Sequence, residues 1–337
     1  MKQLFFILGV LTAVNSVSYN NIRPATLGFE HRRLESVELG EVNYYLTKDS
    51  INKQKPLLVY LDGSGSFPLF QKMDAGIGST VVIDFQKLRD KFKILLISKP
   101  GVPFADSVGR DNHGFPVYKT PSEYTERMSL EWRVQSANLI INELIKNKSI
   151  LVDKIIAFGF SEGAQVVPKL ASINKNITHI MLFGGNGLNQ LFDPIISARL
   201  KSSRGQISEF EAQSIIDSLF QIYSEIYRHP ESTAKRWWGH TYKRWASFAQ
   251  TDPYKFLVNL DIPIYIANGS LDENSVLSAD YIQLEFIKHK KNNLTYKTYP
   301  NYDHQFNEII TKNGQFIKSI PHLDRVLRTA FEWLDKQ

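Results

Sequence analysis

Short apolar runs that alternate with amphipathic stretches most limit what this chain of 337 residues can fold into. The runs are typical of strands buried on both faces of a parallel sheet, and apolar residues at helical spacing mark the stretches between them. The predicted strands are 42–46, 57–61, 94–97, 154–158, 179–183, 262–267 and 294–299, and the predicted helices are 122–146, 161–173, 274–290 and 322–336. This order predicts an α/β fold with a doubly wound, mostly parallel sheet.

One stretch interrupts the alternation. Residues 188–255 contain helical patterns and no convincing strand, which predicts a helical insertion over the carboxyl edge of the sheet rather than a separate domain. Its part at 235–248 is crowded with aromatic residues. On a helix, Trp238, Tyr242 and Trp245 would share one face. We expect that face either to line a ligand pocket or to pack the insertion against itself.

The first 18 residues have the pattern of a secretory signal peptide. Lys2 precedes an apolar run at 4–14, and the small residues Ser16 and Ser18 offer cleavage sites. The run is too short for a permanent membrane anchor, and no later segment is apolar enough to span a bilayer. A buried N-terminal strand or helix is the alternative. We therefore expect a mature domain over 25–337, exported to a bacterial periplasm or to the medium.

Composition excludes several classes of function. The chain has no cysteine, which rules out disulfides, thiolate metal sites and a cysteine nucleophile, and which fits a bacterial exported protein better than a eukaryotic one. Its 40 basic and 34 acidic residues leave a net charge of +6, spread without a basic stripe, so no nucleic-acid partner is expected. Asp111 and His113 lie close together without further ligands at metal-binding spacing, so we expect neither a metal nor a cofactor.

A serine stands between a predicted strand and a predicted helix. The strand 154–158 runs into Gly159-Phe160-Ser161-Glu162-Gly163, and an apolar helix follows at once. In a G-x-S-x-G turn the glycines are needed because the turn is too tight for side chains, and the serine hydroxyl is left exposed. The start of the helix also favours developing negative charge. The pattern predicts Ser161 as a nucleophile, with a plain strand-to-helix turn as the alternative.

Two further polar residues follow later strands in the order that such a serine requires. A serine hydroxyl needs a base to take its proton and a carboxylate to orient that base. Asp272 follows the predicted strand 262–267, and His304 follows the predicted strand 294–299. Since each residue comes after its own strand, and the acid precedes the histidine, we predict His304 as the base of Ser161 and Asp272 as its partner.

A glycine-rich segment follows the strand 57–61. It reads Asp62-Gly63-Ser64-Gly65-Ser66, and in this architecture such a loop supplies one backbone N–H to an oxyanion. We predict the N–H groups of Ser64 and Glu162 as the oxyanion donors. A phosphate-binding loop is the alternative, but no lysine directly follows and no G-x-G-x-x-G is completed.

These motifs together resemble the α/β-hydrolase superfamily over about residues 40–337. The segment 159–163 resembles its nucleophile elbow, the segment 62–65 its oxyanion loop, and Asp272 and His304 its acid and base. The insertion lies where the superfamily carries its cap. The resemblance implies the α/β-hydrolase fold and hydrolysis of an ester, thioester or amide through an acyl-enzyme, without a cofactor.

Two positions depart from common patterns in the superfamily. Asp62 stands where many lipases and esterases have histidine, and Glu162 stands where many peptidases have tyrosine or another bulky residue. We expect a secreted serine hydrolase of the carboxylesterase type that acts on a small ester. A peptidase or acyl-aminopeptidase of the same fold and an inactive binding protein are the alternatives. We expect Arg127 and Arg133 to be solvated on the surface of a helix, with contact to an anionic substrate as the alternative.

Overall fold

The computed structural model describes residues 22–48, 55–74 and 76–337. The predicted signal peptide lies outside these residues. Backbone contacts divide the chain into two compact units; the first holds most of the residues up to 180, and the second holds those from 181 onward together with 129–131 and 171–173. No helix in the described ranges is both long enough and apolar enough to cross a membrane.

Five strands of the main sheet lie in the first unit. They follow one another in the order β1 (Phe29–Ser36), β2 (Gly40–Thr47), β6 (Lys93–Ile97), β3 (Pro56–Leu61) and β10 (Leu151–Phe160). Both strands beside β3 run parallel to it, and Val59 is paired with Leu95 on one side and with Ala157 on the other. All residues of β3 after Pro56 are buried, as the uninterrupted apolar run predicted.

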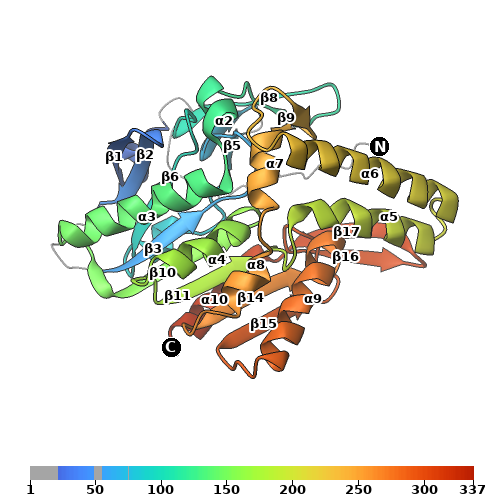
Figure 1. Cartoon of the computed structure of the whole chain (residues 1–337). Helices are drawn as coiled ribbons and strands as arrows, with labels where there is room; N and C mark the ends of the chain where they lie inside the picture. The colour runs from blue at the N-terminus through green and yellow to red at the C-terminus, as the bar shows by residue number, and fades with distance from the viewer. Residues whose placement is uncertain (1–21, 49–54, 75) are drawn as a thin grey trace. The chain divides into compact units, whose positions relative to one another are not determined.

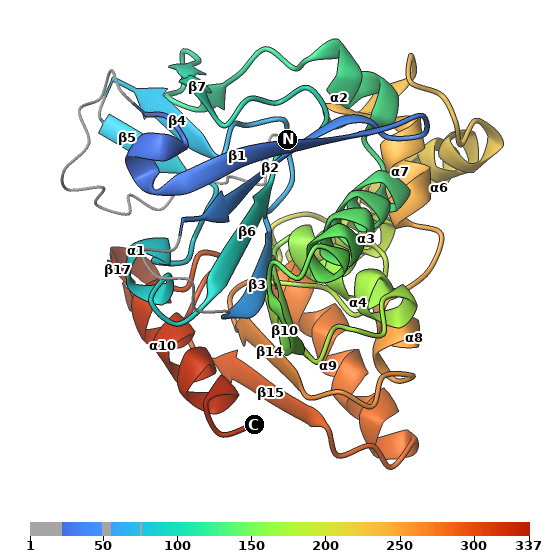
Figure 2. The ribbon, with the colours of Figure 1, turned by 90° about the vertical axis from the view of Figure 1, so that its left-hand side faces the viewer.

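Helices cover both faces of this sheet. α3 (Leu130–Lys146) and α4 (Gly163–Ile173) lie on one face of β3 and β10, and α1 (Phe85–Leu88) lies on the other (Figure 2). The helix predicted at 122–146 is broken, because Met128 has an extended backbone and separates α2 (Ser122–Arg127) from α3. Short strands flank this layer: β4 (Phe70–Met73), β5 (Gly76–Ser79), β7 (Ala105–Ser107), β8 (Gly109–Arg110) and β9 (Pro116–Val117).

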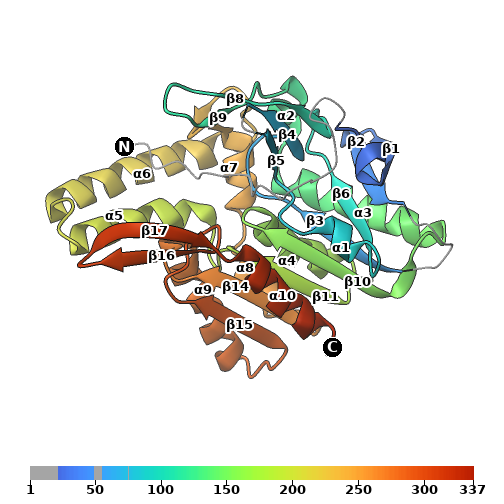
Figure 3. The same cartoon turned by 180° about the vertical axis from the view of Figure 1, so that it is seen from behind.

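The second unit continues with parallel strands. β11 (His179–Phe183) begins in the first unit and ends in the second, where β14 (Ile264–Gly269) and β15 (Leu294–Tyr299) pair in parallel. α9 (Glu273–Lys288) covers one face of β14 and β15, and α10 (Leu323–Leu334) covers the other (Figures 2 and 3). All seven strands predicted from the sequence are therefore present, with β14 displaced by two residues.

A hairpin in the second unit escaped the sequence analysis. β16 (Asn307–Lys312) and β17 (Gln315–Pro321) are antiparallel and are joined by Asn313 and Gly314, both with positive φ. An Asn-Gly pair is the usual two-residue turn of a tight hairpin. That dipeptide was the signal that could have revealed these strands.

The segment 188–255 is largely helical, as predicted. It contains η3 (Gln190–Phe192), α5 (Asp193–Ser203), α6 (Glu209–Arg228), α7 (Tyr242–Phe248) and α8 (Pro253–Leu257), with α5 and α6 side by side (Figures 1 and 3). The start of α6 is fixed by Ser208, whose hydroxyl accepts a hydrogen bond from the N–H of Glu211.

The aromatic stretch in this segment is not one helix, so the prediction of a shared helical face is wrong. β12 (Arg236–Trp237) and β13 (His240–Thr241) form a small hairpin, and Trp238 lies in its turn with a φ of 45°. The helix α7 starts only at Tyr242, where the hydroxyl of Thr241 caps it.

The two tryptophans of the predicted helical face, Trp238 and Trp245, have different surroundings. Trp245 is only 5% exposed and packs in an apolar cluster with Tyr223 and Ile226. Trp238 is 52% exposed and stacks on Trp237, with their ring centroids 4.5 Å apart. Packing of the insertion itself therefore accounts for Trp245, whereas Trp238 is available at the surface.

Candidate active site

Ser161 lies in a strained turn between β10 and α4. Its φ is 55°, a left-handed conformation that costs a residue with a side chain about 1–2 kcal/mol. A Cβ on Gly159 would lie 2.4 Å from the carbonyl oxygen of Gly163, and a Cβ on Gly163 would lie 2.0 Å from the carbonyl oxygen of Leu61. Neither contact is possible, so both glycines are required. The steric reason that the sequence suggested for them is present in the structure.

The close approach at Gly163 places the start of α4 directly against the end of β3 and the loop that follows it. In that loop Ser64 is half-buried, and within the described residues neither its N–H nor its hydroxyl has a hydrogen-bond partner. The N–H of Ser64 can therefore bind a ligand, which its predicted role as an oxyanion donor requires.

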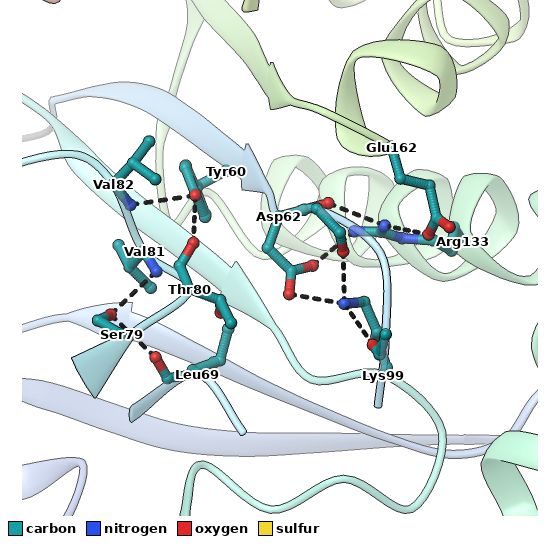
Figure 4. A network of polar contacts seen from close by, with 12 residues as sticks. Tyr60, Asp62, Leu69, Ser79, Thr80, Val81, Val82, Lys99, Arg133 and Glu162 are labelled. Carbon is teal, nitrogen blue, oxygen red and sulfur yellow. Dashed lines mark hydrogen bonds and ion pairs between the residues drawn. The ribbon is translucent and has the colours of Figure 1, made fainter. Parts of the chain in front are cut away.

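Four buried charged side chains lie beneath this loop (Figure 4). Nζ of Lys99, two residues after β6, donates to Oδ2 of Asp62 at 2.8 Å and to the carbonyl oxygens of Gly63 at 2.6 Å and Gly65 at 2.8 Å. Burial lowers the pKa of Lys99, while the carboxylate of Asp62 acts in the opposite direction. The loop is thus held from below by one ammonium group.

Arg133 joins the two positions that depart from common patterns in the superfamily. Its Nη2 donates to Oδ1 of Asp62 at 2.7 Å, and its Nη1 donates to Oε1 of Glu162 at 2.8 Å and to the carbonyl oxygen of Asp62 at 2.9 Å. One guanidinium therefore links the loop after β3 to the residue after the nucleophile. The acidic side chains at both positions, Asp62 and Glu162, are thus the partners of one buried cation.

The prediction that Arg133 is solvated is wrong, since its side chain is only 3% exposed. Arg127, in contrast, is partly exposed and donates to the carbonyl oxygen of Glu38 at 3.1 Å. The sequence did hold a signal for Arg133. It stands three residues after Leu130 and four before Ala137, on the apolar stripe by which α3 packs against the sheet.

Asp272 and His304 meet in the second unit. Oδ2 of Asp272, at the start of α9, lies 2.6 Å from Nδ1 of His304, in the loop after β15. The two loops can approach because Gly269 has no side chain; a Cβ there would lie 2.3 Å from the carbonyl oxygen of Tyr302. The sequence prediction that Asp272 partners His304 agrees with this distance.

This pair has the protonation chemistry of a general base. With Nδ1 of His304 donating to Asp272, the lone pair that can accept a proton is on Nε2. Burial opposes the charged imidazolium, but the carboxylate of Asp272, with a smaller contribution from Asp303, raises the pKa of His304 above the usual histidine value. The histidine is therefore made a stronger base than a free imidazole.

A buried acid near this pair escaped the sequence analysis. Asp193 at the start of α5 is only 3% exposed, accepts a hydrogen bond from the amide of Asn186, and has no partner within the described residues for Oδ1. Burial raises its pKa well above the usual range; the hydrogen bond from Asn186 opposes this rise, and the charge of Asp272 adds to it. A single aspartate in a helical segment carries no sequence signal for this.

The predicted site residues fall into two groups. Ser161, Ser64 and Glu162 belong to the first unit, whereas Asp272 and His304 belong to the second. Among the described residues, no three histidine, aspartate or glutamate side chains gather as ligands for a metal ion.

Comparison with solved structures identifies the class of fold. The chain is similar to an acylaminoacyl peptidase in complex with Z-Gly-Gly-Phe-chloromethyl ketone, with a TM-score of 0.57, 12% identity, and coverage of 92% of this chain and 41% of that one. It is also similar to acylaminoacyl peptidase from Pyrococcus horikoshii, with a TM-score of 0.53, 13% identity, and coverage of 82% and 37%. Est1E from Butyrivibrio proteoclasticus gives a TM-score of 0.50 at 14% identity, with coverage of 91% and 98%.

The chain thus spans about two fifths of the length of these peptidases, 41% and 37%, and nearly all of Est1E, 98%. No protein-family model and no curated protein matches it. The fold is that of the α/β hydrolases, as the sequence predicted.

Proposed function

We propose that this protein is a serine hydrolase that cleaves a small carboxylic ester through an acyl-enzyme on Ser161. The observation that carries the proposal is the turn at Ser161. A serine held at a φ of 55°, between two glycines that have no room for a Cβ, is strained in the way that nucleophile elbows are. The pair of Asp272 and His304 supports it, because a serine needs such a base.

The proposed reaction has two steps. His304 takes the proton of Ser161 as Oγ bonds to the ester carbonyl carbon, and the carbonyl π electrons move to the oxygen, where the N–H groups of Ser64 and Glu162 hold it. The tetrahedral intermediate then expels the alkoxide, which takes the proton from the imidazolium. Water attacks the acyl-enzyme by the same route and releases the acid and the free serine. Asp272 stabilises the imidazolium in both steps.

The test is labelling with a fluorophosphonate probe followed by a substrate panel. The probe should modify Ser161 of the wild-type protein, located by peptide mass mapping, and should leave the Ser161→Ala variant unlabelled. That variant should fold normally and lose about 10⁴-fold or more in turnover. Retention of more than about a tenth of wild-type activity would refute the role of Ser161.

A panel of nitrophenyl esters and peptide nitroanilides then decides between the esterase and the peptidase or acyl-aminopeptidase of the same fold. Higher kcat/KM on esters supports the proposal. A preference for peptide amides assigns the site to peptide hydrolysis, and labelling without any turnover favours a binding protein.

We also propose that the first 18 residues direct export and are then removed. Lys2, the apolar run at 4–14 and the small residues Ser16 and Ser18 support this. Intact-mass measurement on protein recovered from the periplasm or the medium should show a chain that begins at residue 17 or 19. A cytoplasmic chain that still begins at Met1 or Lys2 would contradict it.

A further inference from the structure

Lys99 is a buried lysine whose ammonium group binds the loop that carries Ser64 (Figure 4). Its side chain is 2% exposed. Its three acceptors are Oδ2 of Asp62 and the carbonyl oxygens of Gly63 and Gly65, at 2.8, 2.6 and 2.8 Å. An ammonium group has three N–H donors, so these contacts use all of them. The conformation of the loop is therefore fixed by a single cation that has no hydrogen-bond donor left for solvent.

The contact with Gly63 also sets the direction of the Ser64 N–H. Both groups belong to one peptide unit, and no cis peptide bond occurs among the described residues. In a planar trans peptide the C=O and the N–H point in opposite directions. Because Lys99 holds the carbonyl of Gly63 at 2.6 Å, the N–H of Ser64 points away from the buried ammonium. Ser64 is half-buried, and this N–H has no hydrogen-bond partner among the described residues.

Stability alone does not account for this arrangement. Lys99 and Arg133 carry two positive charges, and Asp62 and Glu162 carry two negative ones, so the cluster is neutral but fully buried. Burying ion pairs costs desolvation, and apolar residues of similar volume often do as well or better. A cation on a carbonyl oxygen also polarises its peptide and makes the N–H on the other side a stronger donor. Both the direction and the strength of the Ser64 donor thus depend on Lys99.

We propose that Lys99 is a positioning residue for acyl transfer, which orients and polarises the Gly63–Ser64 peptide so that the N–H of Ser64 is presented to the developing oxyanion. Lys99 itself touches neither the substrate nor the nucleophile in this role. The inference rests on the proposed function, because the oxyanion is that of the ester reaction on Ser161.

The experiment compares three variants of the full chain. Lys99→Met removes the ammonium group but leaves Asp62 with an unpaired oxygen, which can destabilise the protein. The Asp62→Asn/Lys99→Met double variant restores the neutrality of the cluster. Lys55→Met is the matched control, because the ammonium group of Lys55 also donates to a backbone carbonyl, that of Arg89 at 2.7 Å, but stands before the opposite end of β3.

Each variant is first titrated with the fluorophosphonate probe, so that kcat for nitrophenyl acetate refers to competent serines only. A trifluoromethyl ketone, which forms a tetrahedral oxyanion on the serine, then reports on the oxyanion donors directly. For both Lys99 variants we expect kcat per titrated serine to fall about 10²-fold, as when one oxyanion donor is lost. The Ki of the ketone should rise by a similar factor, KM should change by less than about threefold, and Lys55→Met should match wild type.

The melting temperature distinguishes two causes of a lower kcat: a misplaced Ser64 N–H and the unbalanced charge of the cluster. The double variant should regain most of the stability lost in Lys99→Met without regaining kcat. Recovery of kcat together with stability, or an unchanged Ki for the ketone, would overturn the inference and leave the proposed function intact. If the probe does not label wild-type Ser161, the proposed function fails first, and this inference fails with it.

Discussion

Gly163→Ala tests how tightly the nucleophile turn is built against the loop after β3. The added Cβ would lie 2.0 Å from the carbonyl oxygen of Leu61, 2.7 Å from its carbonyl carbon and 2.9 Å from the carbonyl oxygen of Asp62. A carbon and a carbonyl oxygen rest at roughly 3.3 Å or more. The two backbones must therefore separate by about 1.3 Å, since neither is the flexible end of a side chain.

Gly163→Ala has two opposing effects on the stability of the folded protein. Alanine favours a helix over glycine by about 1 kcal/mol, whereas overpacking of a rigid contact costs about 1–3 kcal/mol or more. The steric cost should win, with a lowering of the melting temperature by a few degrees, at roughly 2–4 °C per kcal/mol for a domain of this size. Catalysis should suffer more, because a displacement of about 1 Å between reacting groups can cost 10²-fold in rate.

The assay measures kcat per titrated serine on a nitrophenyl ester, together with the melting temperature. Gly109→Ala is the control, because its Cβ would meet only the carbonyl oxygen of Val117, at 3.9 Å. The control should behave as wild type. A Gly163→Ala protein with kcat per serine within about threefold of wild type would refute the argument that this contact positions the nucleophile.

Four further substitutions test the second unit. Asp272→Asn removes the carboxylate that raises the pKa of His304, so the acidic inflection of kcat/KM should move to lower pH while kcat falls about 10⁴-fold; an unmoved inflection would contradict the pairing. Trp245→Ala should lower the free energy of unfolding by about 3–5 kcal/mol, whereas the exposed Trp238→Ala should leave it nearly unchanged, as calorimetry can check. Asp193→Asn should stabilise the protein: with its pKa raised by burial, the folded state keeps a proton that the unfolded chain releases near pH 4, so stability falls as pH rises above about 4. The gain in melting temperature should be largest at pH 7–8 and shrink toward pH 4, and equal melting points at pH 8 would count against a protonated Asp193.

The fold and the outline of the site follow from local sequence patterns. Short continuous apolar runs indicate strands buried on both faces, and apolar residues at a period of 3.6 indicate helices; every strand predicted in this way is present. The glycines around Ser161 indicate a turn that only small residues permit. Asp272 and His304 could be paired because each follows the carboxyl end of its own strand, and β14 and β15 are parallel neighbours.

Local patterns could not decide how the aromatic stretch folds. Trp238 fits a helical face by spacing alone, but Gly239 with a φ of 78° allows a tight turn there, and the hairpin ends before α7 begins. The burial of Trp245 then depends on α6, the preceding long helix, which packs against α7.

Sequence alone determined that a serine, an acid and a histidine follow three strands, but only the tertiary structure decided which charges surround the serine. Lys99 and Asp62 are 37 residues apart and meet because β3 and β6 are parallel neighbours, so the segments after both strands emerge side by side. Arg133 joins them because its position on α3 faces the sheet. A charged residue in a sequence is expected in water, since burial without a partner is too costly. Only the pairing of strands and helices brings the partners together that make this burial possible.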